Sequence, residues 1–279
     1  MSAVLYDEPG PLARKRIMLG SVLGGIVLAA GLVWIVLKLK SEGIFDGDRW
    51  DVFSDGVVWE SFGRAWWATV RAAGVAAVLA LLFAVVLAVW RMAKNPLVRL
   101  PGTIVVELLR GLPLLILILF LLLGFGLTSF RALVLGLTLY NGAIIAEILR
   151  AGINSLPAGQ SEAAYAIGLT RGQTLRTILL PQAVRRMLPS IISQLVVLLK
   201  DTSLGFIVAY VELLRTARLN ADFFGNRYIF SFFFIAAAMY IVTNFALSRV
   251  AVWLERRGTT KAAGAKPQAS VVVAGEPNI

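Results

Sequence analysis

The chain has 279 residues, of which 58% are hydrophobic and 15% charged, with a mean hydropathy of +0.80. Soluble domains are about half apolar and about 25% charged, and disordered chains need low hydrophobicity, so both classes are excluded. The absence of cysteine and histidine removes disulfides, thiolate metal sites and the commonest general base. A formal charge of +11 would indicate nucleic acid in a soluble protein, but its distribution has another explanation.

Six stretches are long and apolar enough to cross a bilayer, which takes about 20 residues. In chain order they are 17–37, 65–90, 104–127, 132–148, 189–213 and 229–254. The first follows three basic residues, as in a signal peptide, but it lacks a small-x-small cleavage site and has the length of a span. We therefore expect a retained helix and an all-α integral membrane protein of about six transmembrane helices.

The basic residues indicate the orientation of these spans. With the N-terminus inside, the inner segments 1–16, 91–103, 149–188 and 249–279 carry 16 basic and 5 acidic residues. The outer segments 38–64, 128–131 and 211–228 carry 8 of each. The excess of positive charge is therefore a topology signal that places both termini in the cytoplasm, and no nucleic-acid partner is needed to explain it.

The pattern divides the chain into three parts. Residues 1–64 hold an N-terminal tail, one span and an acidic outer segment, which is either a solvated linker or a contact for an external partner. Residues 65–257 hold the remaining spans, and we expect residues 258–279 to form a disordered cytoplasmic tail. The chain shows no internal repeat, and since a transport path needs two halves, the second half is expected from another chain.

Segment 149–188 is too polar to span the membrane and predicts a small helical hairpin on the cytoplasmic side. Ser161 is a candidate N-cap that would place Glu162 in the first turn of a helix ending at Gly168. Thr170 would cap a second helix that ends at a turn before Pro181. The hairpin is either a loop packed on its own bundle or a docking element for a cytoplasmic partner.

The spacing within this hairpin is specific. Its pattern is Glu162-Ala163-Ala164, then Gly168, then Ile178 and Leu180-Pro181. The whole pattern resembles the EAA loop of bacterial ABC importer permeases, at about residues 155–186. Segments 110–113, 140–150, 156–160, 180–183, 199–204 and 211–213 are similar to the polar amino acid (histidine, glutamine and glutamate) branch of that family, although Leu112 replaces its usual Thr. The resemblance covers about residues 58–257.

The resemblance implies a role and a set of partners. The chain would be the permease subunit of an importer for a polar amino acid, with glutamate or glutamine favoured over a basic amino acid, in the bacterial cell membrane. A second permease chain, in a heterodimer rather than a homodimer, would complete the path, and an extracytoplasmic binding protein would deliver substrate. The EAA helix would sit in a groove of a separate ATPase dimer. Ala163 and Ala164 would allow the helix to approach the ATPase closely, and Gly168 would allow the turn between the two short helices. Glu162 would cap the helix or pair with the ATPase.

The energy source must lie outside this chain. The sequence contains no Gly-Lys dipeptide and therefore no Walker A motif, so ATP and Mg²⁺ would be bound by the partner ATPase and no cofactor by this chain. The serines have no recognisable base partner, which argues against an enzyme. A secondary transporter or channel would explain six spans but not the spaced EAA pattern, and a structural anchor would explain neither.

Charges within or beside spans are candidates for the substrate path, because a charge at mid-bilayer costs about 2.5–3.5 kcal/mol. Glu107 and Arg110 lie three residues apart on one helix face, as do Glu147 and Arg150. Glu107 and Arg110 either neutralise each other structurally or contact substrate or a gate. Glu147 is a further candidate for the path, whereas Arg150 and Arg71 are expected at the interface, with their side chains reaching lipid headgroups.

Two polar interruptions complete the candidate set. Lys200-Asp201-Thr202-Ser203 interrupts an apolar run, as in a discontinuous helix lining a midplane cavity, although an interhelical cluster between permease chains would give the same pattern. Tyr140 and Asn141 interrupt the fourth span in the same way. Asn141 suits a zwitterion because it both donates and accepts, or it joins helices.

Overall fold

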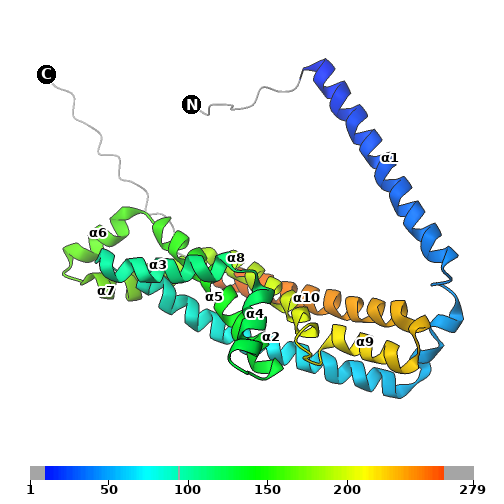
Figure 1. The fold of residues 1–279 in the computed structure, drawn as a ribbon. Coiled ribbons are helices and arrows are strands. Elements are labelled where there is room, and N and C mark those ends of the chain that lie inside the picture. Colours follow the sequence, from blue (N-terminus) through cyan, green and yellow to red (C-terminus); the bar gives the residue numbers. More distant parts are fainter. Residues whose placement is uncertain (1–9, 94, 261–279) are drawn as a thin grey trace.

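The computed structural model describes residues 10–93 and 95–260, and the regular structure within them is helical throughout. The helices are α1 (Pro11–Ser41), η1 (Gly47–Arg49), η2 (Asp51–Ser54), α2 (Gly56–Arg91), α3 (Pro96–Gly111), α4 (Leu114–Gly124), α5 (Ser129–Asn154), α6 (Ala158–Ala166), α7 (Arg171–Thr174), η3 (Leu175–Leu179), α8 (Leu180–Asp201), η4 (Thr202–Phe206), α9 (Leu213–Phe224), η5 (Asn226–Tyr228) and α10 (Ile229–Thr260). Figure 1 shows an elongated bundle with α6 and α7 at one end and α9 at the other.

The centre of the bundle is the contact between α2 and α5. One face of α2 carries fully buried alanines at four-residue spacing. They are Ala72, Ala76, Ala80, Ala84 and Ala88. On α5, a Cβ added to Gly142 would lie 2.8 Å from Phe83 Cδ1 and 3.1 Å from the Ala80 carbonyl oxygen. Small residues allow such close approach of helix backbones within a membrane, so this pair forms the core on which α8 and α10 pack.

The third predicted span is not a single straight helix. Helices α3 and α4 meet at an angle of 101°. The bend lies at Leu112, whose φ of −77° and ψ of 134° are extended. A proline disfavours the helical conformation of the residue before it, and Pro113 follows directly. The apolar stretch predicted over 104–127 therefore consists of two helices, and the cause of the break was already present in the sequence.

Within the described residues, five helices are long and apolar enough to cross a membrane, and a sixth span is added if α3 and α4 count as one bent span. The prediction of an all-helical protein with about six spans is confirmed at this level. Helix α1 differs from the others, because none of its residues is buried and it stands away from the bundle (Figure 1).

The acidic segment after α1 is folded onto the bundle rather than free as a linker. Val52 is buried, and Ser231 of α10 donates a hydrogen bond of 2.7 Å to the carbonyl oxygen of Arg49. Trp50 meets Phe234 edge to face at 5.7 Å. Helix α2 begins at Gly56, earlier than predicted, because Asp55 caps it by accepting a hydrogen bond from the Val57 amide. The predicted tail, beyond Thr260, lies outside the described residues.

Candidate functional site

The first half of the EAA hairpin begins earlier than the sequence suggested. Helix α6 starts at Ala158, directly after Pro157. Ser161 therefore lies inside the helix, where its hydroxyl donates to the Ala158 carbonyl at 2.8 Å, and it is not the N-cap. Glu162 is likewise beyond the first turn and is exposed. Pro157 itself is the N-cap of α6 and provides no side-chain hydrogen bond to the helix end.

Gly168 ends α6 with a defined turn. Its φ is +84°, in the left-handed region that glycine enters without the steric cost of a Cβ. The Gly168 amide donates to Tyr165 O at 3.0 Å, and the Leu169 amide donates to Ala164 O at 3.1 Å. These two bonds form a Schellman motif, which satisfies the carbonyls at a helix end. The predicted turn at Gly168 therefore has a specific backbone reason.

The second half of the hairpin begins as predicted and ends differently. Thr170 caps α7 in a capping box with Gln173, so two backbone amides are satisfied reciprocally. The expected turn before Pro181 is absent, because the π-turn η3 leads directly into α8. Pro181 lies in the first turn of α8, where a missing N–H is tolerated. The hairpin is thus continuous with the next span.

The hairpin presents an exposed tip on an anchored base. Ile167 is 77% exposed, while Ala164 is only 2% exposed. At the base, Gln182 donates to Gln160 at 3.2 Å and Arg186 donates to Ser155 O at 2.9 Å. Ala163 and Glu162 are exposed. Of the residues predicted to meet a partner, Ala164 therefore packs inside this chain instead.

The two predicted ion pairs are present and belong to one network. Arg110 lies 3.6 Å from Glu107, and Arg150 lies 2.6 Å from Glu147. Arg91 joins them, since its guanidinium lies 2.5 Å from Glu147 and 3.5 Å from Glu107. The sequence pattern placed Arg91 in a loop and missed it. The network connects the end of α2 with α3 and α5, close to the start of the hairpin.

Tyr140 and Asn141 do not break the fourth span, because α5 is continuous from Ser129 to Asn154. Asn141 is fully buried. Its amide donates to Leu137 O at 3.0 Å, and its side-chain oxygen accepts from Gln194 of α8 at 2.7 Å. The described contacts of Asn141 therefore join α5 to α8.

The interruption at residues 200–203 ends a helix. Helix α8 stops at Asp201, η4 follows, and the chain turns before α9. Thr202 is buried, with its hydroxyl 3.4 Å from that of Tyr240. Tyr240 donates to Glu212 at 2.6 Å, and Glu212 also accepts the amides of Leu214 and Arg215 at 2.8 and 2.7 Å. The sequence pattern did not identify Glu212 and Tyr240 as site residues, although Glu212 lies in segment 211–213, which resembles the amino acid permease family.

Lys200 and Ser203 line a groove of about 760 Å³ between α8, α9 and α10. The other polar residues lining it are Tyr240, Asn244 and Ser248. The side-chain oxygen of Asn244 is buried and has no hydrogen-bond partner in the described part of the chain. The groove thus combines a cation, hydroxyls and a buried acceptor that has no partner among the described residues. It does not include Glu107, Arg110, Glu147 or Asn141.

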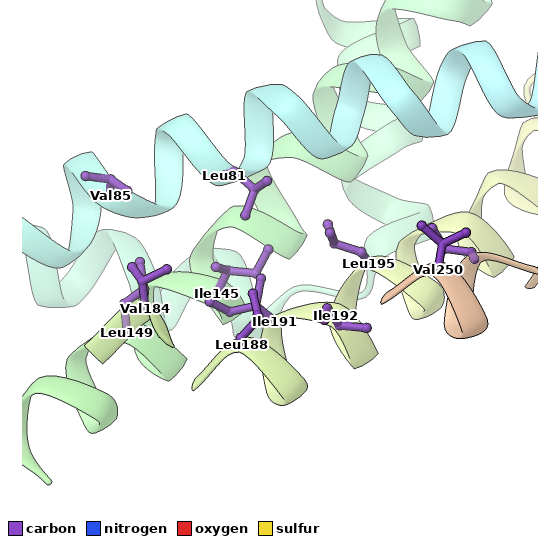
Figure 2. Close-up of a pocket in the computed structure, with 11 residues that line it drawn as sticks. Leu81, Val85, Ile145, Leu149, Val184, Leu188, Ile191, Ile192, Leu195 and Val250 are labelled. Atoms are coloured by element: carbon purple, nitrogen blue, oxygen red, sulfur yellow. The ribbon is translucent and has the colours of Figure 1, made fainter. Parts of the chain in front are cut away.

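A second cavity, of about 380 Å³, is apolar throughout. Figure 2 shows its lining side chains, such as Leu81 from α2, Ile145 from α5 and Leu195 from α8, turned toward one another. It contains no group that would recognise a polar solute, so the polar groove is the better candidate for a substrate path.

Comparisons with known proteins identify transport permeases as the relatives of this chain. The family model described as "Binding-protein-dependent transport system inner membrane component" matches residues 76–259. The chain is 38% identical to the glutamate transport system permease protein GluD of Corynebacterium glutamicum over 228 residues, which covers 78% of this chain and 83% of that protein. It is 39% identical to the probable glutamine ABC transporter permease protein GlnP of Bacillus subtilis over 197 residues, with 68% and 90% covered.

Solved structures give the same result. A chain from the crystal structure of an amino acid ABC transporter with histidines matches with a TM-score of 0.65 and 28% identity, covering 71% of this chain and 94% of that one. A chain of the MetNI methionine ABC transporter, at 19% identity and a TM-score of 0.58, supports the fold alone. The chain therefore belongs to the family of inner membrane components of binding-protein-dependent transport systems: it is a multi-pass, non-catalytic permease subunit of an amino acid ABC importer.

Proposed function

We propose that this permease carries glutamate or glutamine inward, together with a second, related permease chain and a separate ATPase dimer. The names of the two relatives above, glutamate and glutamine permeases at 38% and 39% identity, support this choice of substrate. In the proposed topology both termini are cytoplasmic, the EAA hairpin faces the ATPase, and an extracytoplasmic binding protein delivers the amino acid to the opposite end.

The observation that carries the coupling proposal is the built hairpin. The Schellman turn at Gly168 and the capping box at Thr170 fix its shape without help from a partner. Its tip, with Ile167, Ala163 and Glu162, is left exposed. An exposed apolar tip on a rigid base is the form expected of a docking element. Because the hairpin continues into α8 through η3, a push on the tip would reach the helix that lines the polar groove.

The groove supports an amino acid as the solute. The ammonium of Lys200 suits a carboxylate, and the unpartnered oxygen of Asn244 suits an α-ammonium group. Ser203 adds a hydroxyl. We assign these residues to the substrate path, whereas Thr202 would position the groove through Tyr240 and Glu212. Tyr140 and Asp201 remain candidates for the substrate path.

The remaining candidates receive structural roles in this proposal. Glu107, Arg110 and Glu147 would hold α2, α3 and α5 together through Arg91, and Asn141 would join α5 to α8. Their contacts inside this chain leave few free donors or acceptors for a solute.

Uptake by cells with and without this gene tests the function. A panel of labelled amino acids is offered, with one arm depleted of ATP while ion gradients are maintained. We expect loss of glutamate or glutamine uptake on deletion, and loss on ATP depletion in cells that carry the gene. Uptake that follows the ion gradient instead would indicate a secondary transporter and contradict the proposal.

Gly168→Asp tests the coupling. Forcing a side chain into the left-handed region costs about 1 kcal/mol and distorts the turn, so we expect the protein to reach the membrane but to lose ATPase association and most uptake. Gly47→Asp is the matched control, because it adds the same charge at the opposite end, where a Cβ meets nothing within 4 Å. Normal uptake with normal ATPase association in Gly168→Asp would refute the docking role.

Lys200→Gln tests the groove separately. Lys200 is exposed and makes no ion pair in the described part of the chain, so the variant should fold and keep its ATPase association. We expect a higher apparent KM for the substrate. An unchanged KM would remove Lys200 from the path without affecting the coupling proposal.

A further inference from the structure

A polar pocket lies at the end of the bundle that carries the hairpin. Its volume is about 410 Å³, and three arginines, Arg91, Arg99 and Arg150, line it together with Thr103 and Asn154. They come from the end of α2, the start of α3 and the end of α5. The pocket is therefore built by three elements rather than by one flexible loop.

The positive charge around this pocket is only partly neutralised. Arg91, Arg110 and Arg150 share two carboxylates, Glu107 and Glu147. Arg99 adds a further cation and has no ion pair in the described part of the chain. The side chain of Arg91 is only 9% exposed, and its Nε is buried without a hydrogen-bond partner among the described residues. A buried, unpaired guanidinium donor is costly and indicates a site for an anion.

An apolar stripe runs beside the pocket on α3. Leu97, Leu100, Ile104 and Leu108 follow one another at helical spacing and are all exposed. Arg99 and Thr103, one turn apart, line the pocket on the neighbouring face of the same helix. Trp90 fixes α3 to α2, since its indole N–H donates to Val98 O at 2.8 Å and its ring packs against Gly102. Helix α3 therefore presents a cationic face and an apolar face side by side.

We propose that this pocket binds the phosphate group of an anionic phospholipid, with the acyl chains along the stripe on α3. Guanidinium groups pair with phosphate through two parallel hydrogen bonds, and basic pockets between transmembrane helices hold anionic headgroups. A free phosphate would pair with the arginines in the same way but would make no contact with the exposed leucines of α3. The apolar stripe therefore favours a lipid as the occupant. A bound lipid would hold α2, α3 and α5 together at the end of the bundle that carries the hairpin.

The test uses the full-length chain, purified with the partners it has in its own membrane. Complexes are exchanged into phosphatidylcholine nanodiscs with or without phosphatidylglycerol, and bound lipid is counted by native mass spectrometry. Arg99→Gln is the main variant, because Arg99 is exposed and unpaired and its loss should not disturb folding. Arg185→Gln is the matched control: Arg185 is exposed on α8 near the same end and is not among the residues that line the pocket.

Loss of one guanidinium should weaken phosphatidylglycerol binding about five-fold, since a basic residue near an anionic surface contributes about 1 kcal/mol. Arg99→Lys should bind more tightly than Arg99→Gln but less tightly than wild type, because an ammonium keeps the charge and cannot form two parallel hydrogen bonds. Arg185→Gln should match wild type, and added inorganic phosphate should leave the lipid in place. Equal effects of Arg99→Gln and Arg185→Gln would show general attraction to a basic end and overturn the proposal. Displacement by inorganic phosphate would identify a soluble occupant and overturn it as well.

Discussion

Helices α1 and α2 are similarly apolar, and each is long enough to cross a membrane, yet they have opposite places in the structure. Helix α1 has no buried residue, whereas α2 buries a row of alanines against α5 and supplies the central contact of the bundle. Hydropathy alone does not separate the two helices.

The difference lies in what the small residues meet. Helix α1 also carries glycines, but a Cβ added at Gly20 or Gly24 would find nothing within 4 Å. On α2, by contrast, Ala80 faces Gly142 of α5 so closely that a Cβ added to Gly142 would lie 3.1 Å from the Ala80 carbonyl oxygen. Inside a membrane, lipid replaces water, so close packing rather than the hydrophobic effect holds helices together. A span therefore becomes part of a core only when another helix matches its small-residue face.

Ala80→Leu is expected to have the largest effect on this contact. Ala80 is fully buried and its carbonyl faces Gly142, so a larger side chain would force α2 and α5 apart. Overpacking costs about 1–3 kcal/mol, and we expect a loss near the upper limit, measured by unfolding in mixed micelles. The matched control is Gly24→Leu in α1, which should leave the free energy of unfolding unchanged. An equal loss of unfolding free energy in both variants would show that the small residues of α2 contribute no more to packing than those of α1.

Arg91→Gln should have the next largest effect. Arg91, the last residue of α2, pairs with Glu147 and Glu107, and hydrogen bonds to charged groups contribute about 1.5–3 kcal/mol. Because Arg110 and Arg150 still pair with the two carboxylates, we expect a loss of about 2 kcal/mol.

Arg64→Gln, on the same helix, provides the comparison for Arg91→Gln. Arg64 forms an exposed pair with Glu60 at 3.3 Å, and such pairs contribute about 0.3–0.5 kcal/mol. If thermal unfolding of the two variants were indistinguishable, the network around Arg91 would have no anchoring role, and α2 would be held by its alanines alone.

Gln194→Met should have the smallest effect of the three. It removes the hydrogen bond between α8 and Asn141 of α5 while keeping the volume of the side chain. Hydrogen bonds between membrane helices average about 0.6 kcal/mol. Gln182→Met, which removes the exposed contact with Gln160, serves as the control. A loss in Gln194→Met as large as that in Ala80→Leu would mean that polar contacts, and not small residues, decide which spans pack.

Much of the candidate site could be read in the sequence because its signals are local. Gly168, Thr170 and the two charge pairs at three-residue spacing all depend on neighbours along the chain. Arg91, Gln194 and Tyr240 gave no such signal, because their partners lie on other helices. The same reason explains why Tyr140 and Asn141 were wrongly expected to interrupt α5.

Sequence alone was enough to predict about six apolar spans, the hairpin between two of them and the family to which the chain belongs, and it also contains the Leu112–Pro113 step that bends the third span. These follow from composition, hydropathy and short-range spacing, which act within a few turns of one helix. Only the packed structure shows that α1 stands apart, that Lys200 and Asn244 line one groove, and that Glu107 and Glu147 pair with one arginine. Those facts depend on contacts between residues far apart in the chain, and such contacts exist only once the helices have packed.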